Sequence, residues 1–250
     1  MQVELFHTSL LVDYGLRNGM QLSLRVPYDR KDIDVRYTTL DGGTFDPPYG
    51  DIHHRSERLS GVSDAELFFI VQPARWDGAR WRLAAGGGVT LPIGATEEDP
   101  VRLGREGREH QHIQFGSGTV DPKLLVQASR RLAWGELGGS VSGRFPLYES
   151  SEGFRGPVTI DWSLGPAIAI GTTTLMPQLI GRYQTRARWN GEYDEGTGFV
   201  NSGVAARLAI PLLGFVLIPG VYTEVWSHGF EDETFEQGTT WSLSVARVIR

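Results

Sequence analysis

The chain has 250 residues, which suits one domain, and it contains no cysteine, which excludes a disulfide framework and cysteine-ligated metal. Its formal charge is -6, from 24 basic and 30 acidic residues, which disfavours a dedicated nucleic-acid-binding protein. No stretch approaches the roughly 20 consecutive apolar residues of a transmembrane helix, so a helical membrane protein is excluded as well.

Alternating apolar and polar side chains predict a β-strand about eleven times along the chain. Successive side chains of a strand point to opposite faces, so each segment has one apolar side and one polar side. In chain order the expected strands are Val3–Leu16, Met20–Tyr28, Ala65–Gln72, Trp81–Ile93, Pro122–Arg131, Ser140–Leu147, Val158–Ile170, Leu175–Arg186, Val204–Ile210, Phe215–Trp226 and Trp241–Ala246. We find no convincing amphipathic helix, and the pattern therefore predicts an all-β chain.

The gaps between these segments are alternately short and long. Arg17–Gly19 and Trp76–Gly78 are typical of tight turns, whereas residues 30–61 and 94–118 are long polar loops. This alternation is typical of an antiparallel up-and-down transmembrane β-barrel in a bacterial outer membrane. We therefore predict a single barrel domain over residues 1–250, with apolar side chains facing lipid and polar side chains facing a lumen.

The polar faces of the predicted strands are rich in arginine. Guanidinium groups bind carboxylates and stack on aromatic rings, so this lining favours small anionic or aromatic solutes. The alternative is that arginines and acidic residues pair with one another and only fill a narrow barrel. Trp226 is expected on the same side, and Gly86 and Gly88 are expected to leave room there. The lumen-lining candidates are Arg25, Glu66, Arg82, Arg131, Arg144, Asp161, Gln178, Arg182, Gln184, Arg186, Arg207 and Glu224.

Aromatic residues lie near both ends of the predicted apolar faces. Amphipathic rings favour the two boundaries between membrane and water, where ring body and polar tip are both satisfied. This arrangement indicates that outer-membrane lipid surrounds the barrel. The predicted interface aromatics are Tyr14, Trp81 and Trp134 beside short turns, and Tyr28, Trp162 and Trp189 towards long loops.

The start of the chain departs from what an exported barrel requires. No secretory signal peptide is visible, because Val3–Phe6 already has the pattern of a strand. Single-chain bacterial barrels normally have an even number of strands, whereas we read eleven. Either one segment has been split or merged, or a strand before Val3 completes a barrel of about twelve. We expect a chain that lacks its signal peptide, and a missing first strand is one of these two explanations for the odd count.

Three short segments resemble a known family. Val89–Thr96 is similar to a strand-ending element, and Phe115–Pro122 to the entry of the following strand, in the outer-membrane transporters linked to the meta-pathway of phenol degradation. Arg25–Tyr28 resembles a further element of that family. The resemblance implies an outer-membrane β-barrel that helps hydrophobic or aromatic compounds to cross, and it implies no catalytic residues.

Histidines and acidic residues in the loops give weaker patterns. His110 and His112 would share one face of an extended chain, and His53 and His54 lie in another loop, but no third ligand is fixed. Glu231–Glu233 is an acidic run without the spacing of a calcium-binding loop. We therefore predict no metal and no other cofactor.

An enzyme is the least favoured function. His7, Ser9 and Asp13 share one strand face, but the sequence contains no nucleophile elbow. We predict instead a passive channel or uptake protein for small solutes, without nucleic acid as a partner. The alternatives are a non-conducting structural or surface-interaction barrel and a soluble ligand-binding barrel. The sequence leaves the oligomeric state open.

Overall fold

The computed structural model describes residues 2–48, 55–72, 81–110, 113–194, 197–230 and 237–249. Within these ranges one antiparallel sheet contains twelve strands, eleven of which follow one another along a single path. In spatial order these are β1 (Gln2–Gly15), β2 (Met20–Asp34), β4 (Ala65–Val71), β5 (Trp81–Leu91), β6 (Pro122–Leu132), β7 (Gly135–Arg144), β9 (Thr159–Ile170), β10 (Thr173–Gln184), β13 (Phe199–Leu212), β14 (Phe215–Gly229) and β15 (Thr240–Ala246). The predicted all-β fold with up-and-down strand order is confirmed.

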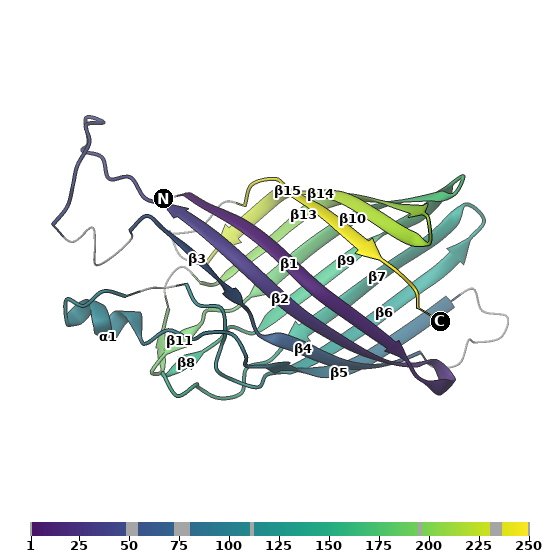
Figure 1. Ribbon diagram of the computed structural model, residues 1–250, viewed down its shortest axis with the longest axis horizontal. Helices are drawn as coiled ribbons and strands as arrows, with labels where there is room; N and C mark the ends of the chain where they lie inside the picture. Colours follow the sequence, from purple (N-terminus) through teal and green to yellow (C-terminus); the bar gives the residue numbers. More distant parts are fainter. Residues whose placement is uncertain are drawn as a thin grey trace.

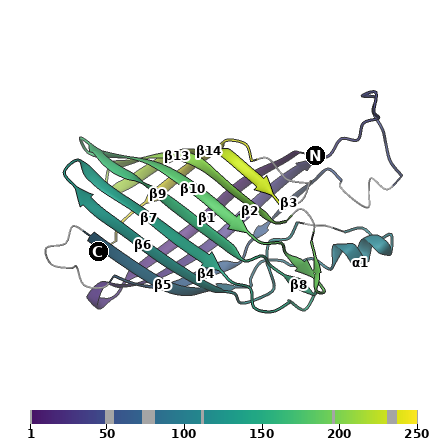
Figure 2. The same ribbon diagram turned by 180° about the vertical axis from the view of Figure 1, so that it is seen from behind.

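The sheet curls around a hollow, as Figures 1 and 2 show from opposite sides. Long connections gather at one end of the strands, here called the loop end, and short connections at the other, called the turn end. The loop end carries the helix α1 (Pro100–Arg105) and a small sheet of β8 (Phe154–Arg155), β11 (Arg188–Trp189) and β12 (Glu192–Tyr193). No helix in the described ranges is long and apolar enough to cross a membrane.

Several of the tight turns at the turn end contain residues with a left-handed backbone. The first turn, η1 (Arg17–Gly19), has φ values of 63° at Asn18 and 73° at Gly19. Asn and Gly are the residues that tolerate this conformation, which suits a hairpin between twisted strands. The expected turn at Trp76–Gly78 lies outside the described residues.

The predicted loop over residues 30–61 is wrong in part, because strand pairing continues into it. β2 extends to Asp34, and β3 (Glu57–Val62) pairs with its loop-end half. Between β3 and β4, the ladder is interrupted opposite Pro27, which has no N–H to donate. The amide of Ser63 there donates to the Pro27 carbonyl at 3.0 Å. This corner brings Asp64 to the concave side of the sheet.

The short helix α1 was not expected from the sequence. Asp99 begins it: its side chain accepts from the amides of Val101 at 2.9 Å and Arg102 at 3.2 Å. Pro100 follows in the first turn, where its missing N–H costs nothing. An Asp-Pro pair is a helix-start signal, but six residues are too few to show helical periodicity.

The sheet has two free edges, because the described residues form no ladder between β1 and β15. Ten antiparallel pairings separate the two strands along the path, so they run in the same direction (Figure 1). The sheet is therefore open along one seam.

Candidate functional site

The strand register sorts side chains into a concave and a convex face. Residues directly opposite each other in a ladder share a face, so Arg182 lies beside Asp161 on one side and Asn201 on the other. Of the lumen-lining candidates, the ladders place on this same concave face Arg25, Glu66, Arg82, Arg131, Arg144, Asp161, Gln178, Arg182, Gln184, Arg207 and Glu224.

Arg186 is the exception among these candidates. β10 ends at Gln184, so the expected strand is two residues too long, and Arg186 belongs to the connection that follows. Its guanidinium carbon lies 5.0 Å from the ring centroid of Tyr193. The side chain is thus held at the loop end rather than along the wall.

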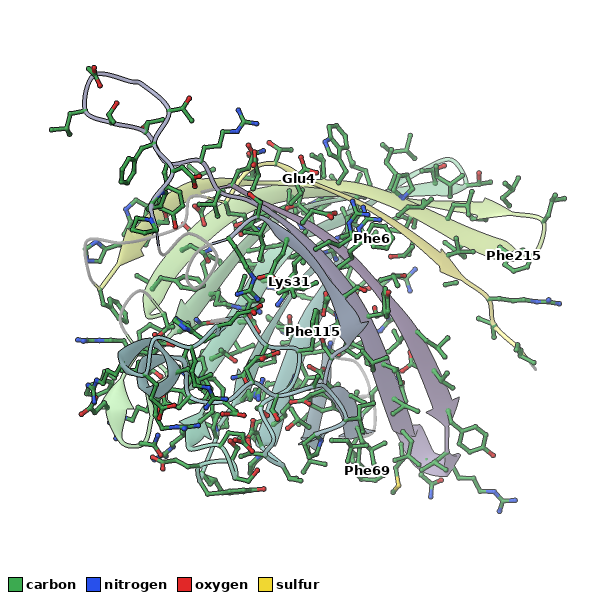
Figure 3. All side chains as sticks on the ribbon, turned by 60° about the vertical axis from the view of Figure 1, so that its left-hand side comes forward. Glu4, Phe6, Lys31, Phe69, Phe115 and Phe215 are labelled. Carbon is green, nitrogen blue, oxygen red and sulfur yellow. The ribbon has the colours of Figure 1, made fainter. Side chains whose placement is uncertain are left out.

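The convex face carries large apolar side chains that are exposed. Leu10 is 65% exposed, Leu124 57% and Trp241 79%, although soluble proteins rarely leave such residues in one continuous surface. Each of the eleven strands along the path contributes at least one exposed apolar side chain to this face, namely Leu10, Leu22, Leu67, Leu83, Leu124, Val141, Leu164, Leu179, Val204, Phe215 and Leu243. In Figure 3, Phe69 and Phe215 lie at the periphery, away from the hollow.

Five of the six predicted interface aromatics lie on the outside of the sheet. By register Tyr14, Tyr28, Trp81 and Trp162 are on the convex face, and Trp134 is exposed in the turn between β6 and β7. Their lipid contact stays a prediction.

Trp189 is the aromatic that was placed wrongly. It is only 4% exposed, because it packs against Phe154 in the small loop-end sheet, with ring centroids 4.8 Å apart.

Trp226 also departs from its expected face. A bulge between β13 and β14 inserts Val225, so that Glu224 lies opposite Gly203 while Trp226 lies opposite Ser202. One extra residue reverses the alternation from that point onward, which moves Trp226 to the convex face.

Several charged side chains on the concave face are paired with one another. Lys123 Nζ lies 2.5 Å from Glu66 Oε1, and Arg182 Nε lies 2.6 Å from Asp161 Oδ1. Asn201 Nδ2 donates to Glu224 Oε2 at 2.7 Å, and its Oδ1 accepts from the Arg182 amide at 3.1 Å. We call this set, together with Arg25 and Arg144, the charge belt. It presents both signs of charge to the hollow.

Arg25 of the charge belt contacts a histidine of the neighbouring strand. Its Nη2 lies 2.9 Å from His7 Nε2, and His7 Nδ1 lies 2.6 Å from Asp29 Oδ1. A guanidinium can only donate, so Nε2 accepts and Nδ1 carries the proton given to Asp29. Ser63 also donates to Asp29. His7 is thus engaged with Asp29 and Arg25, not with the strand neighbours Ser9 and Asp13.

A pocket of about 310 Å³ lies where the charge belt meets the loop end. His7, Arg25 and Asp29 come from β1 and β2, while Arg144 comes from β7. Residues 114–117, between β5 and β6, line it as well, together with Phe154, Gly156, Pro157, Glu66 and the corner residues Ser63 and Asp64. Parts of the chain from opposite sides of the sheet therefore surround one space.

Residues 113–121, which lead from the long connection after β5 into β6, fold against the concave wall. Figure 3 shows Phe115 beside Lys31 in the hollow, and Lys31 Nζ lies 4.9 Å from the Phe115 ring centroid. The same ammonium donates to the Gln114 carbonyl at 3.3 Å. Sequence reasoning treated this segment as an external loop, and Asp64, Gln114 and Ser117 were missed.

The glycines expected to leave space in the hollow do not do so. A Cβ on Gly88 would lie 2.9 Å from the Phe68 ring, and one on Gly86 would lie 3.0 Å from Ile70 Cγ1. Neighbouring side chains thus occupy the room beside these two positions. The interior is narrower there than glycine content alone suggests.

The described residues contain no group of three or more potential metal ligands. His110 is buried, and its Nδ1 lies 2.9 Å from the Arg108 carbonyl. His53, His54, His112 and the acidic run Glu231–Glu233 lie outside the described ranges.

Taken as a class, this is an antiparallel barrel-type sheet with an apolar exterior and a charged interior. Its fold is similar to that of an outer membrane channel from Pseudomonas putida F1, with a TM-score of 0.60 and 13% identity. The similarity covers 96% of this chain and 80% of that channel. It supports an outer-membrane-type barrel and does not support the link to the meta-pathway. No family model and no curated protein matches the sequence.

Proposed function

We propose that this protein is a bacterial outer-membrane β-barrel that acts as a passive channel or uptake protein for small solutes. The observation that carries the proposal is the polarity of the sheet: exposed apolar side chains on the convex face and the charge belt on the concave face. Water inside and hydrocarbon outside satisfy both faces at once. The similarity to an outer membrane channel supports the same reading.

The solute is proposed from the chemistry of the wall. Arg25, Arg144 and Arg182 line the hollow beside carboxylates, so polar and charged solutes find hydrogen-bonding partners of both kinds. Among these, anionic and aromatic solutes are the class that arginine recognises best. We expect no enzymatic activity and no cofactor, with lipid and solute as the partners.

Planar lipid bilayers test the proposal. The purified full chain should produce discrete single-channel currents in KCl, and liposomes containing it should admit small solutes such as acetate. Absence of both current and solute flux from correctly inserted protein would contradict the channel.

A non-conducting structural barrel is the second candidate function. It is favoured by the ion pairs of the charge belt and by the folded-in residues 114–117, which both occupy interior space. A soluble ligand-binding barrel is less favoured, because its apolar face should point inward. The behaviour of the protein in buffer without detergent tests the soluble barrel, because a soluble barrel stays monomeric there.

A further inference from the structure

Segment 113–121, which leads into β6, enters the hollow at the level of the pocket. Residues 114–117 line the same space as His7, Arg25 and Asp29 of the opposite wall. A solute that moves along this side of the hollow passes between this segment and β1–β2. The width of the passage depends on what holds the segment in place.

Asp64 attaches segment 113–121 to residues 92–95, which directly follow β5. These two stretches are here called the two limbs. Its Oδ1 accepts from the Gly94 amide at 3.2 Å, and its Oδ2 accepts from the amide and hydroxyl of Ser117, each at 2.8 Å. The side chain is buried, so these donors replace the water that a carboxylate otherwise requires. Losing the carboxylate would leave the two amides without an acceptor.

Close backbone contact between the limbs reinforces this attachment. The amides of Phe115 and Gly116 both donate to the Ala95 carbonyl, at 3.1 and 2.8 Å. A Cβ on Gly116 would lie 2.3 Å from the Gly94 carbonyl oxygen and 2.8 Å from Asp64 Oδ1. Only glycine allows the limbs to approach this closely.

The base of the segment is fixed by a second buried network. Thr119 Oγ1 donates to Asp121 Oδ1 at 2.7 Å, and Arg144 Nε donates to Asp121 Oδ2 at 2.7 Å. The Asp121 amide in turn donates to Thr90 Oγ1 at 2.9 Å. Because every member has a partner, the network favours one arrangement of the segment.

We propose that segment 113–121 is a fixed constriction of the channel and that Asp64 is the residue that positions it. The proposal rests on the channel function argued above. It assigns a role to Asp64, which contacts the segment and holds Phe115 and Gln114 against the passage. On this proposal the pore is permanently narrowed rather than an open tube.

Two variants on opposite sides of the attachment test the claim. Asp64→Ala removes the acceptor, and Gly116→Ala forces the limbs apart, so each should raise single-channel conductance about twofold or more as the constriction loosens. Asp41→Ala is the matched control, since Asp41 accepts a hydrogen bond from Thr39 in a separate loop. It should conduct as the parent does. Unchanged conductance in both test variants would overturn the proposal.

A labelling experiment covers the case in which those variants fold poorly. The chain has no native cysteine, so Phe115→Cys introduces one thiol. Reaction with a negatively charged methanethiosulfonate should reduce the current by about half or more, because the adduct fills the passage. The same reagent on Asp41→Cys should leave the current unchanged. A labelled Phe115→Cys channel with full current would contradict the proposal.

The outcomes separate the constriction from the channel function. A conducting parent whose test variants behave like the parent keeps the channel and refutes the constriction. A silent parent with a conducting Asp64→Ala variant refutes the open channel and supports the constriction. If parent and variants are all silent, both proposals fail.

Discussion

Trp162 and Gly181 show how residue choice on one strand depends on the next. A Cβ on Gly181 would lie 2.2 Å from the Trp162 ring, so the glycine gives the indole a flat surface on the convex face. Gly87 lies on that face too, yet a Cβ there would meet nothing within 4 Å. The Trp162 ring therefore requires glycine at residue 181, whereas no neighbouring atom requires it at residue 87.

The contrast predicts opposite responses to alanine. Gly181→Ala should destabilise the protein by about 1–3 kcal/mol, because the Trp162 ring must move out of its packed position. Gly87→Ala should be neutral or slightly stabilising. Chemical unfolding in detergent, followed by tryptophan fluorescence, measures both; equal midpoints for the two variants would contradict the packing argument.

Glu97, which lies between β5 and α1, has a carboxyl group whose ionisation opposes folding. Burial raises the pKa of Glu97, and the neighbouring Glu57 carboxylate raises it further. The folded protein therefore holds the Glu97 proton more tightly than the unfolded chain does. This carboxyl destabilises the fold above its folded pKa, and the penalty disappears as pH falls through the unfolded value.

Glu97→Gln should accordingly raise the thermal midpoint at pH 8, with the difference from the parent vanishing below about pH 4. Glu98→Gln is the control, since Glu98 faces solvent and accepts from Arg102 at 2.8 Å. It should show no such gain. A midpoint of Glu97→Gln equal to the parent at pH 8 would contradict the prediction.

Hydrogen bonds of Asp99 hold helix α1 in place at the loop end. Asp99 caps it and also accepts from Asn190 Nδ2 at 2.7 Å, which ties the helix to the turn between β11 and β12. Asp99→Ala removes both contacts and should cost the helix about 1 kcal/mol. Asn190→Ala removes the tie alone.

Limited trypsin digestion at Arg102 and Arg105 reads out this difference. Cleavage should be fastest for Asp99→Ala, intermediate for Asn190→Ala and slowest for the parent, because only the first variant loses the cap. Identical rates in all three proteins would show that the cap does not hold α1.

Strand periodicity in the sequence predicted the strands that cross the apolar region, because there one face must differ from the other. β2 beyond Tyr28 was missed, since residues 29–34 are mostly polar on both faces and carry no alternation. The bulge at Val225 was missed for a different reason: one inserted residue shifts the phase without changing composition.

The concave site was only half predictable. Arginines and acidic residues alternate with apolar residues along single strands, so the face on which they lie could be predicted from the sequence. Asp64 could not be assigned in this way, because its partners Gly94 and Ser117 lie far away in the chain and meet only in three dimensions. The resemblance segments Val89–Thr96 and Phe115–Pro122 supplied the available signal, since they form the two limbs that contact each other.

The open seam between β1 and β15 leaves backbone groups of both edge strands unpaired. In hydrocarbon each unpaired backbone group costs several kcal/mol, so free edges on β1 and β15 are incompatible with lipid. Since the two strands run in the same direction, one strand antiparallel to both would close the sheet. We propose that in the membrane one further strand, antiparallel to β1 and β15, lies in this seam.

Hydrogen exchange in lipid tests this closure. Amides of β1 that point away from β2 should exchange slowly, at rates like those within the central strand β9. Rapid exchange confined to these outward amides would show that the seam stays open.

We infer that the apolar convex face of the sheet contacts lipid and that the polar concave face contacts water. Spin labels at Leu179→Cys and Gln178→Cys, adjacent residues of β10 on opposite faces, measure it directly in reconstituted membranes. We predict that the Leu179 label collides with dissolved oxygen and is shielded from a water-soluble nickel chelate, whereas the Gln178 label shows the reverse. Equal access of the chelate to both labels, or the opposite order, would contradict the account.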